Sequence, residues 1–295
     1  METPLLARAV VVEETIDPIP CRVRVPGSGD VPLDAWLVAS PEASMKRLLA
    51  AGSGPIWQLG RAFRDGERGA KHLPEFTILE WYRPGFDHHA LMAEVGDLLA
   101  TLLDGFVTVG SAVKRTYRKV FQEHAGIDPH TAGPADLRRA AERLGVAVPA
   151  GLAAEDRDGW LDLLLVAAIE PELGREAPLF VFDYPASQAA LARVRRDEGG
   201  TIVGERFELY FRGLELANGY HELADAAEQE RRFEAANRAR VAAGRPALPI
   251  DRALLAALAA GLPPCAGVAV GFDRIVMLAC GADRIDDAVA FPFEG

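Results

Sequence analysis

Cysteine is scarce in this chain, and its scarcity excludes two kinds of site. The 295 residues include three cysteines, at Cys21, Cys265 and Cys280. Thiols this few and this far apart do not make the disulfide framework of a small secreted domain, and no Cys/His spacing is typical of a zinc site. We therefore expect a protein of a reducing compartment, the cytoplasm.

Long apolar runs and an excess of positive charge are absent as well. No stretch approaches the roughly 18–20 apolar residues of a membrane-spanning helix, and no charged-then-apolar leader opens the chain, so neither a membrane span nor a signal peptide is expected. The net charge is -11, whereas proteins that hold a nucleic-acid backbone neutralise phosphates with Lys and Arg. We expect a small or basic partner.

The residues that are present predict one globular domain over residues 1–295, with 49% hydrophobic and 25% charged residues. Strands interleaved irregularly with helices favour an α+β fold, an antiparallel β-sheet flanked by helices. The expected elements are hairpins over 1–39, a helix capped by Ser40 that runs to about Gly52, a hairpin of 55–64 and 75–83, a helix from 88 to about 105, a helical insertion over about 105–175, and a strand–helix pair from about 266.

The segment RAFRDGERGAKHLPEFTILEWY contains the first candidate site. Residues two apart on a strand share a face, so Arg64, Glu80 and Tyr82 are expected to point the same way. An arginine in a concave site binds a multivalent anion such as a nucleotide phosphate. His72 offers a second phosphate contact, and Phe76 offers a ring for a base to stack on. Taken singly, each of these residues is also compatible with a solvated strand.

Two further motifs follow. In ELANGYHEL, Glu215 and Glu222 flank Asn218, a set that suits either a divalent cation carried in with ATP or the ammonium group of an amino acid; the alternative is a solvated turn. In GVAVGFDR, small residues at 267, 269 and 271 leave room for a flat ligand beside Arg274, or make a tightly packed strand–helix junction. The pair His88 and His89 is expected to begin a solvated helix face rather than a metal site.

In chain order these residues resemble the catalytic domain of the class II aminoacyl-tRNA synthetases, with Arg64 in motif 2 and Arg274 in motif 3. HLPEFTILEWY, FVFDYPASQAALAR and ELANGYHELADAAEQERRF are similar to segments of the lysyl subgroup. SPEASMKRLLAAGSGPIWQLGRAFR and ANGYHEL most resemble the lysyl-synthetase paralogues that lack an anticodon-binding domain and modify elongation factor P. The resemblance covers nearly the whole chain.

The resemblance implies a ligase that uses ATP and Mg²⁺. The carboxylate of β-lysine or lysine attacks the α-phosphorus, pyrophosphate leaves, and a lysine amine of elongation factor P then attacks the aminoacyl-adenylate. Arg64 and Arg274 are the implied catalytic residues. The residues that the resemblance places around the nucleotide are Arg64, Asp65, Gly66, His72, Leu73, Phe76, Glu215, Leu216, Gly271 and Arg274.

The resemblance also implies an amino-acid pocket in which acids and a phenol bind two ammonium groups. Its residues are Ser40, Pro41, Glu42, Glu80, Tyr82, Asn218, Glu222 and Ala269. Glu215 and Glu222 are the implied magnesium ligands. Ala269 stands where lysyl synthetases usually have glycine, and the extra methyl group narrows the pocket, which favours β-lysine over α-lysine.

The chain departs from the family pattern in three places. Motif 2 usually reads Arg-x-Glu, but here Gly66 follows Arg64 and Asp65, with Glu67 as a possible substitute. Leu73 replaces a usual asparagine. The opening METP matches the end of motif 1, so the helix that builds the homodimer interface is expected upstream of residue 1, lost either through a miscalled GTG start codon or through a real truncation.

Two other functions remain open at this point. The chain is also compatible with a free-standing lysyl-type tRNA synthetase, against which the acidic charge and the missing anticodon-binding domain argue. It is compatible as well with a non-catalytic paralogue that binds an amino acid or an adenylate. Retention of both phosphate-binding arginines favours an active enzyme over such a sensor.

Overall fold

A computed structural model describes residues 1–26 and 31–294, which form two compact units. The first unit comprises Met1–Phe86 and Glu222–Gly295, and the second comprises Asp87–His221. The tip of the predicted N-terminal hairpin, residues 27–30, lies outside the described residues. Among the described helices, none has the length and apolar character needed to cross a membrane.

The main sheet of the first unit is antiparallel, with β5 between β4 and β11. Its strands are β4 (Ile56–Phe63), β5 (Glu75–Pro84) and β11 (Cys265–Gly271). Glu80 of β5 pairs with Gln58 of β4 and with Ala269 of β11. Paired residues of neighbouring strands point to the same face, so this register puts residues from three strands on one surface.

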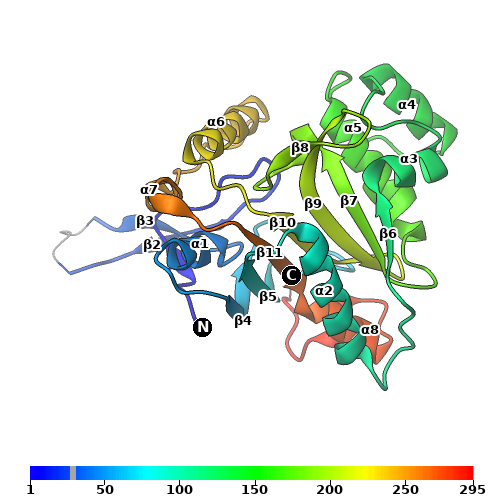
Figure 1. The fold of residues 1–295 in the computed structure, drawn as a ribbon. Helices are drawn as coiled ribbons and strands as arrows, with labels where there is room; N and C mark the ends of the chain where they lie inside the picture. The colour runs from blue at the N-terminus through cyan, green and yellow to red at the C-terminus, as the bar shows by residue number, and fades with distance from the viewer. Residues whose placement is uncertain (27–30, 295) are drawn as a thin grey trace. The chain divides into compact units, whose positions relative to one another are not determined.

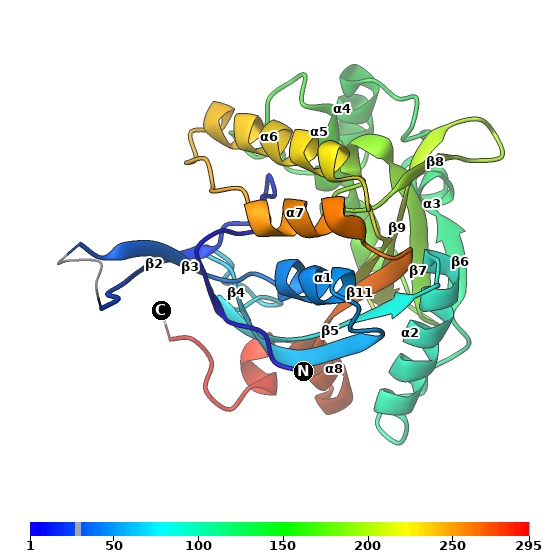
Figure 2. The same cartoon turned by 60° about the vertical axis from the view of Figure 1, so that its left-hand side comes forward.

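The rest of the first unit is a small antiparallel sheet, ordered β1-β3-β2, together with several helices. The strands are β1 (Leu6–Ala7), β2 (Ile19–Val23) and β3 (Leu33–Leu37), and the helices are α1 (Glu42–Ala50), α6 (Ala226–Ala242), α7 (Arg252–Gly261), α8 (Phe272–Cys280) and the 3₁₀ turn Ile285–Ala288. Asp225 and Asp251 cap α6 and α7 by accepting backbone N–H groups of the first turn. Helix α7 packs against both α1 and α6 (Figure 2).

The sheet of the second unit has the order β10-β9-β7-β6, with β8 paired to β9. Its strands are β6 (Val113–Thr116), β7 (Leu179–Pro185), β8 (Val194–Arg196), β9 (Ile202–Phe211) and β10 (Leu214–His221). Only the β6–β7 pair is parallel among these described strands. Arg212 and Gly213 both have positive φ, at 54° and 71°, which is the geometry of a tight hairpin turn between β9 and β10.

The helices of the second unit are α2 (His88–Leu103), α3 (Tyr117–Ala125), α4 (Pro134–Arg143), α5 (Arg157–Leu164), a π-helical segment Leu165–Ile169 and the 3₁₀ turns Glu170–Glu172 and Ala186–Gln188. In this unit α3, α4 and α5 lie together near β6 and β7 (Figure 1), and α2 packs against β9 and β10. Phe121 and Leu161 pack with Tyr184 and Tyr210 of the sheet in a buried core. Burying each such side chain contributes about 1.5–3 kcal/mol, so this core fixes the helices on the sheet.

These elements confirm the predicted α+β class with a mainly antiparallel sheet, and α3, α4 and α5 lie inside the predicted helical segment 105–175. One prediction about α2 is wrong. His88, its first residue, is 2% exposed and therefore does not lie on a solvated face. The sequence misled because His88 directly follows the capping residue Asp87, and polar residues at a helix start are usually exposed.

Candidate active site

The face of the first unit's sheet that carries Glu80 also carries Tyr82, as the spacing of the sequence predicts. Tyr82 pairs with Gly267 of β11. A Cβ atom at position 267 would overlap the ring of Tyr82 and lie 2.5 Å from Oε1 of Glu222. Glycine is therefore required here by the protein's own side chains, which is a more specific reason than the flat ligand that the sequence suggested.

Three carboxylates and one ammonium group are buried together at this face. Glu42, Glu80 and Glu222 are 8%, 2% and 3% exposed, and Lys46 is 1% exposed. The Nζ atom of Lys46 lies 2.5 Å from Oε1 of Glu42 and 2.5 Å from Oε2 of Glu222. Because Lys46 compensates one negative charge, the cluster keeps an excess of carboxylates over cations.

Glu80 is held by two hydroxyl groups. Ser40 Oγ donates to its Oε2 at 2.7 Å, and Tyr82 Oη donates to its Oε1 at 2.7 Å. Ser40 Oγ also accepts from the backbone N–H of Glu42 at 3.0 Å. Ser40 was expected to be the N-cap of this helix, but α1 begins at Glu42 with Pro41 at the N-cap position; the Ser40 hydroxyl still satisfies a first-turn N–H.

Burial makes the acids of this cluster weaker. Burial, with the neighbouring charge of Glu42, raises the pKa of Glu80 to about 7, against the lowering effect of its two hydroxyl donors. Burial likewise raises the pKa of Glu222 to about 8, although the Lys46 ammonium pulls it down. The pKa of Lys46 is raised by Glu222 and Glu42, which outweigh its own burial, so Lys46 stays charged. Without a ligand, Glu80 and Glu222 therefore lose their protons at a higher pH than ordinary glutamates do.

Arg64 follows β4 and lies over the ring of Phe76, with its guanidinium carbon 5.0 Å from the ring centroid. Its Nη1 atom is 3.6 Å from Oε1 of Glu67, the residue predicted to substitute for the missing motif 2 glutamate. Its buried Nε atom has no hydrogen-bond partner among the described residues. A buried donor without a partner suits an arginine whose partner is a ligand.

Arg274, in the first turn of α8, approaches the loop between β4 and β5. Its Nη2 atom lies 2.6 Å from Nε2 of His72, and its Nε donates to the carbonyl of Lys71 at 3.3 Å. Burial and the charge of Arg274 lower the pKa of His72. The structure thus joins the histidine and the arginine that the sequence had assigned separately to phosphate groups.

The other predicted residues of the loop between β4 and β5 have conformations and burial that suit their residue types. Gly66 has φ +74°, a left-handed conformation that glycine adopts without strain. Asp65 Oδ1 accepts from the N–H of Gly66 at 3.0 Å. Leu73 is buried at 3% exposure. Glycine at position 66 therefore suits the left-handed turn of this loop.

A cavity of about 350 Å³ opens within the first unit. Its lining includes four of the predicted site residues, Ser40, Pro41, Glu42 and Arg64. Glu80, Tyr82 and Glu222 are not among its lining residues. The cavity therefore combines an acidic residue of the amino-acid cluster with the arginine predicted to bind phosphate.

Three of the predicted residues, Glu215, Leu216 and Asn218, lie on β10 of the second unit. The alternative of a solvated turn is wrong for this motif, because residues 214–221 form a strand. Asn218 Nδ2 donates to Oη of Tyr220 at 3.1 Å, and its Oδ1 is buried without a hydrogen-bond partner among the described residues.

Sequence reasoning missed Lys46. The one local signal for it is its position four residues after Glu42, a spacing at which helical side chains of opposite charge meet. Its second partner, Glu222, is far away in the chain, so that contact had no sequence signal.

Comparison with known proteins gives a consistent result. Residues 1–295 match the family model described as tRNA synthetases class II (D, K and N). The chain is similar to the "Elongation factor P--(R)-beta-lysine ligase" of Salmonella arizonae, with 49% identity over 291 residues, 99% of this chain and 87% of the relative. It is equally similar to the protein of that name from Yersinia enterocolitica, with 49% identity over 292 residues and the same coverage.

Proposed function

We propose that this chain, which belongs to the class II tRNA synthetases (D, K and N), is an ATP-dependent ligase that activates (R)-β-lysine as an adenylate and transfers it to a lysine side chain of elongation factor P. The support is threefold: the family, the names of relatives that are 49% identical over 99% of the chain, and the chemistry of the buried acids in the first unit.

The observation that carries the proposal is the charge of the cluster around Glu80. Three carboxylates and one lysine are buried in this cluster, so full ionisation leaves an excess of two negative charges. Uncompensated buried charge is strongly unfavourable. A ligand with two ammonium groups relieves it, and β-lysine and lysine are ligands of this kind.

The choice of β-lysine over lysine rests on Ala269 and on the relatives. Ala269 pairs with Glu80 across the sheet, so its methyl group lies on the face that holds the acids. One methyl group changes discrimination between similar substrates by about 10- to 200-fold. We propose that the methyl group of Ala269 narrows the amino-acid pocket and so favours a substrate whose amino group is at the β position.

Two arginines of the first unit fit the phosphate groups of a nucleoside triphosphate. Arg64 presents a buried Nε donor that has no hydrogen-bond partner among the described residues, and Arg274 presents its guanidinium beside His72. A guanidinium group can donate two parallel hydrogen bonds to two oxygens of one phosphate. ATP supplies the adenylyl group: the amino-acid carboxylate forms a bond to the α-phosphorus, and the bond from that phosphorus to pyrophosphate breaks. Arg64 and Arg274 neutralise charge and position the phosphates.

Magnesium would accompany ATP, and the structure favours one of its two predicted ligands. Glu222 is buried 2.5 Å from the Lys46 ammonium, a cation that competes with a metal ion for its oxygens. We therefore assign Glu222 to the amino-acid pocket and keep Glu215 as the proposed magnesium ligand.

The proposed acceptor comes from the names of the relatives, and the charge and the chemistry are compatible with it. An amine attacks the adenylate directly, so the protein needs no nucleophile of its own, and a lysine on a translation factor supplies that amine in the cytoplasm. The net charge of -11 suits a basic patch around the acceptor lysine and disfavours tRNA.

Amino-acid-dependent ATP–pyrophosphate exchange tests this activity. The protein is given ATP, Mg²⁺ and either (R)-β-lysine, α-lysine or no amino acid. We expect exchange that is fastest with (R)-β-lysine and is lost in Glu80→Gln. If neither (R)-β-lysine nor α-lysine supports exchange, the proposed activity is wrong. If α-lysine alone supports it, the activity stands but the substrate assignment is wrong.

A further inference from the structure

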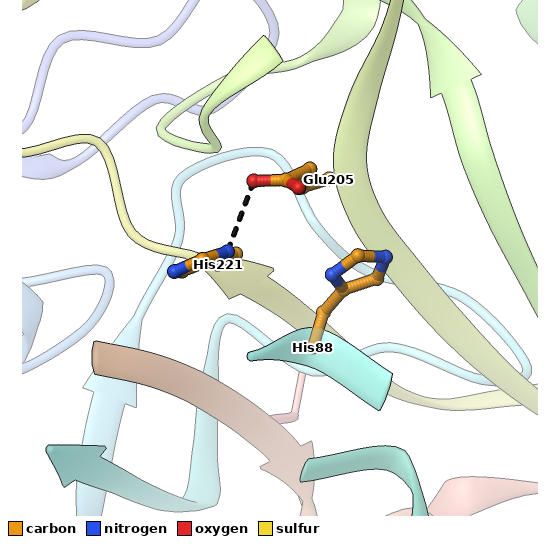
Figure 3. Close-up of side chains that lie close together, drawn as sticks. All are labelled: His88, Glu205 and His221. Carbon is orange, nitrogen blue, oxygen red and sulfur yellow. Dashed lines mark ion pairs between the residues drawn. The ribbon is translucent and has the colours of Figure 1, made fainter. Parts of the chain in front are cut away.

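A second cluster of ionisable side chains lies wholly within the second unit, and the proposed ligase reaction does not use it. His88 begins α2, Glu205 lies on β9 and His221 ends β10, and the three side chains approach one another (Figure 3). Each offers one nitrogen or oxygen atom, and these atoms all lie within 4.8 Å of one another. One helix and two strands thus each contribute a side chain that can bind a metal ion, and the three side chains lie close together.

The polar atoms of this cluster are poorly satisfied for their burial. His88 is 2% exposed and Glu205 is 9% exposed. Both ring nitrogens of His88, Oε2 of Glu205 and Nδ1 of His221 are buried without a hydrogen-bond partner among the described residues. Nδ1 of His221 and Oε2 of Glu205 are 2.9 Å apart, an ion-pair contact when His221 is protonated, so the unsatisfied atoms of the cluster are chiefly the two ring nitrogens of His88. Buried polar atoms are nearly always satisfied, so this concentration of exceptions needs a cause.

We propose that His88, Glu205 and His221 bind a Zn²⁺ ion. Two imidazoles and one carboxylate form a donor set that zinc takes, with water in the fourth position. Tetrahedral ligands at about 2.0–2.2 Å from the metal lie roughly 3.3–3.5 Å from one another. The ligand atoms of the three side chains all lie within 4.8 Å of one another, so binding would require them to adjust to this spacing. Oxygen-preferring ions such as Mg²⁺ are disfavoured by the two nitrogen ligands.

The charges around the cluster identify a competitor for the metal. Arg193 Nη1 lies 3.3 Å from Nε2 of His221, and its Nε lies 3.5 Å from Oε2 of Glu205. Arginine only donates hydrogen bonds, so Nε2 of His221 must accept here and the ring proton must lie on Nδ1. Zinc at Nδ1 moves that proton to Nε2 and expels Arg193, whose side chain is 50% exposed and can turn into solvent.

The other charged neighbours stay in place. Arg195 Nε lies 3.5 Å from Oε1 of Glu205, and its Nη2 donates to both carboxylate oxygens of Asp183 at 2.6 and 2.8 Å. Asp183 therefore balances the charge of Arg195.

The ion would have a structural role. It ties the first residue of α2 to β9 and to the last residue of β10, all within the second unit. The residue after His221 is Glu222, whose carboxylate belongs to the amino-acid cluster. Zinc would thus fix the main chain immediately before a proposed substrate-binding residue, and this role does not depend on the ligase proposal.

The test is zinc binding by the whole, EDTA-stripped protein, measured in competition with a chromophoric chelator in excess Mg²⁺. We expect one equivalent of tight Zn²⁺, and with Co²⁺ the strong visible absorption of a tetrahedral site. His88→Gln, Glu205→Gln and His221→Gln should each weaken binding by tenfold or more. His124→Gln, a histidine on α3 outside the cluster, should leave it unchanged, and Arg193→Gln should strengthen it by removing the competitor.

Three results would overturn the proposal. One is a wild-type protein that binds no stoichiometric Zn²⁺. Another is binding that all three cluster variants retain. A third is an Arg193→Gln protein that binds Zn²⁺ more weakly, which would show that this arginine supports the ion instead of competing with it. Far-UV circular dichroism of each variant, together with the wild-type Co²⁺ spectrum, keeps loss of binding distinct from misfolding.

Discussion

The Nζ atom of Lys46 lies 2.5 Å from Oε2 of Glu222, and both side chains are 1% exposed. This ion pair links α1 to the residue at which the chain re-enters the first unit. It also decides how many negative charges remain for a ligand, because Lys46 contacts Glu42 and Glu222 but leaves Glu80 to Ser40 and Tyr82. We therefore expect the pair to affect both the stability of the protein and the binding of its proposed substrate.

Lys46→Met should destabilise the protein by about 3–5 kcal/mol, because removing one partner of a buried pair leaves uncompensated carboxylates. Urea unfolding measures the loss. The double variant Lys46→Met/Glu222→Gln should recover part of the lost stability, since the second change removes the Glu222 carboxylate that has lost its partner. Additive losses in the double variant would show that the two residues do not interact energetically.

Gly267→Ala should lower the free energy of unfolding by about 1–3 kcal/mol, because its Cβ would overlap Tyr82 and press on Glu222. Gly271→Ala on the same strand is the matched control, since its Cβ would meet nothing nearer than Cδ of Arg274 at 3.5 Å. Thermal melts of both variants compare them. Equal melting temperatures would contradict the steric role given to Gly267.

Arg64→Ala should lower the rate of ATP–pyrophosphate exchange by about 10²–10³-fold, the usual effect of removing one charge-stabilising donor. Arg61, three residues earlier on β4, provides the control, because it pairs with Thr77 and makes an exposed contact with Glu75. Arg61→Ala should leave exchange within about twofold. If both variants lose activity alike, the loss comes from the hairpin as a whole and not from a phosphate contact.

The stability of the ligand-free protein should carry a pH dependence set by Glu80 and Glu222. Their folded-state pKa values, raised to about 7 and about 8, exceed the ordinary value near 4.5. The folded state therefore retains protons that the unfolded state has released. This contribution to stability is complete below about pH 4.5 and is lost as the pH rises toward 8.

The difference in melting temperature between wild type and Glu80→Gln across pH 4.5–8 isolates this effect from that of other carboxylates. Wild type should lose stability relative to Glu80→Gln as the pH rises. Added β-lysine, which favours the ionised acids, should stabilise wild type more at pH 8 than at pH 6. A constant difference across this range would contradict the raised pKa of Glu80.

The sequence predicted the fold class and the common face of Glu80 and Tyr82, because strand periodicity and helix capping are local properties. It did not predict the reason for Gly267, which depends on Tyr82 and Glu222 approaching from other parts of the chain. Local patterns report which way a side chain points, and only the tertiary structure reports what it meets there.

The histidines show the same limit more sharply. His88 was predicted to be solvated because its neighbours in sequence are polar. Its burial and its approach to Glu205 and His221 arise from pairing within the second unit's sheet and from the packing of α2, which no short segment encodes.

The most direct test of the central claim is acceptor labelling. The protein is given ATP, Mg²⁺ and (R)-β-lysine, with elongation factor P and bulk tRNA offered side by side, and intact-mass analysis follows both acceptors. We predict a mass increase of one lysyl unit on elongation factor P, none on tRNA, and no labelling by Arg274→Ala. Labelling of tRNA alone, or adenylate formation with transfer to neither acceptor, would contradict the proposed function.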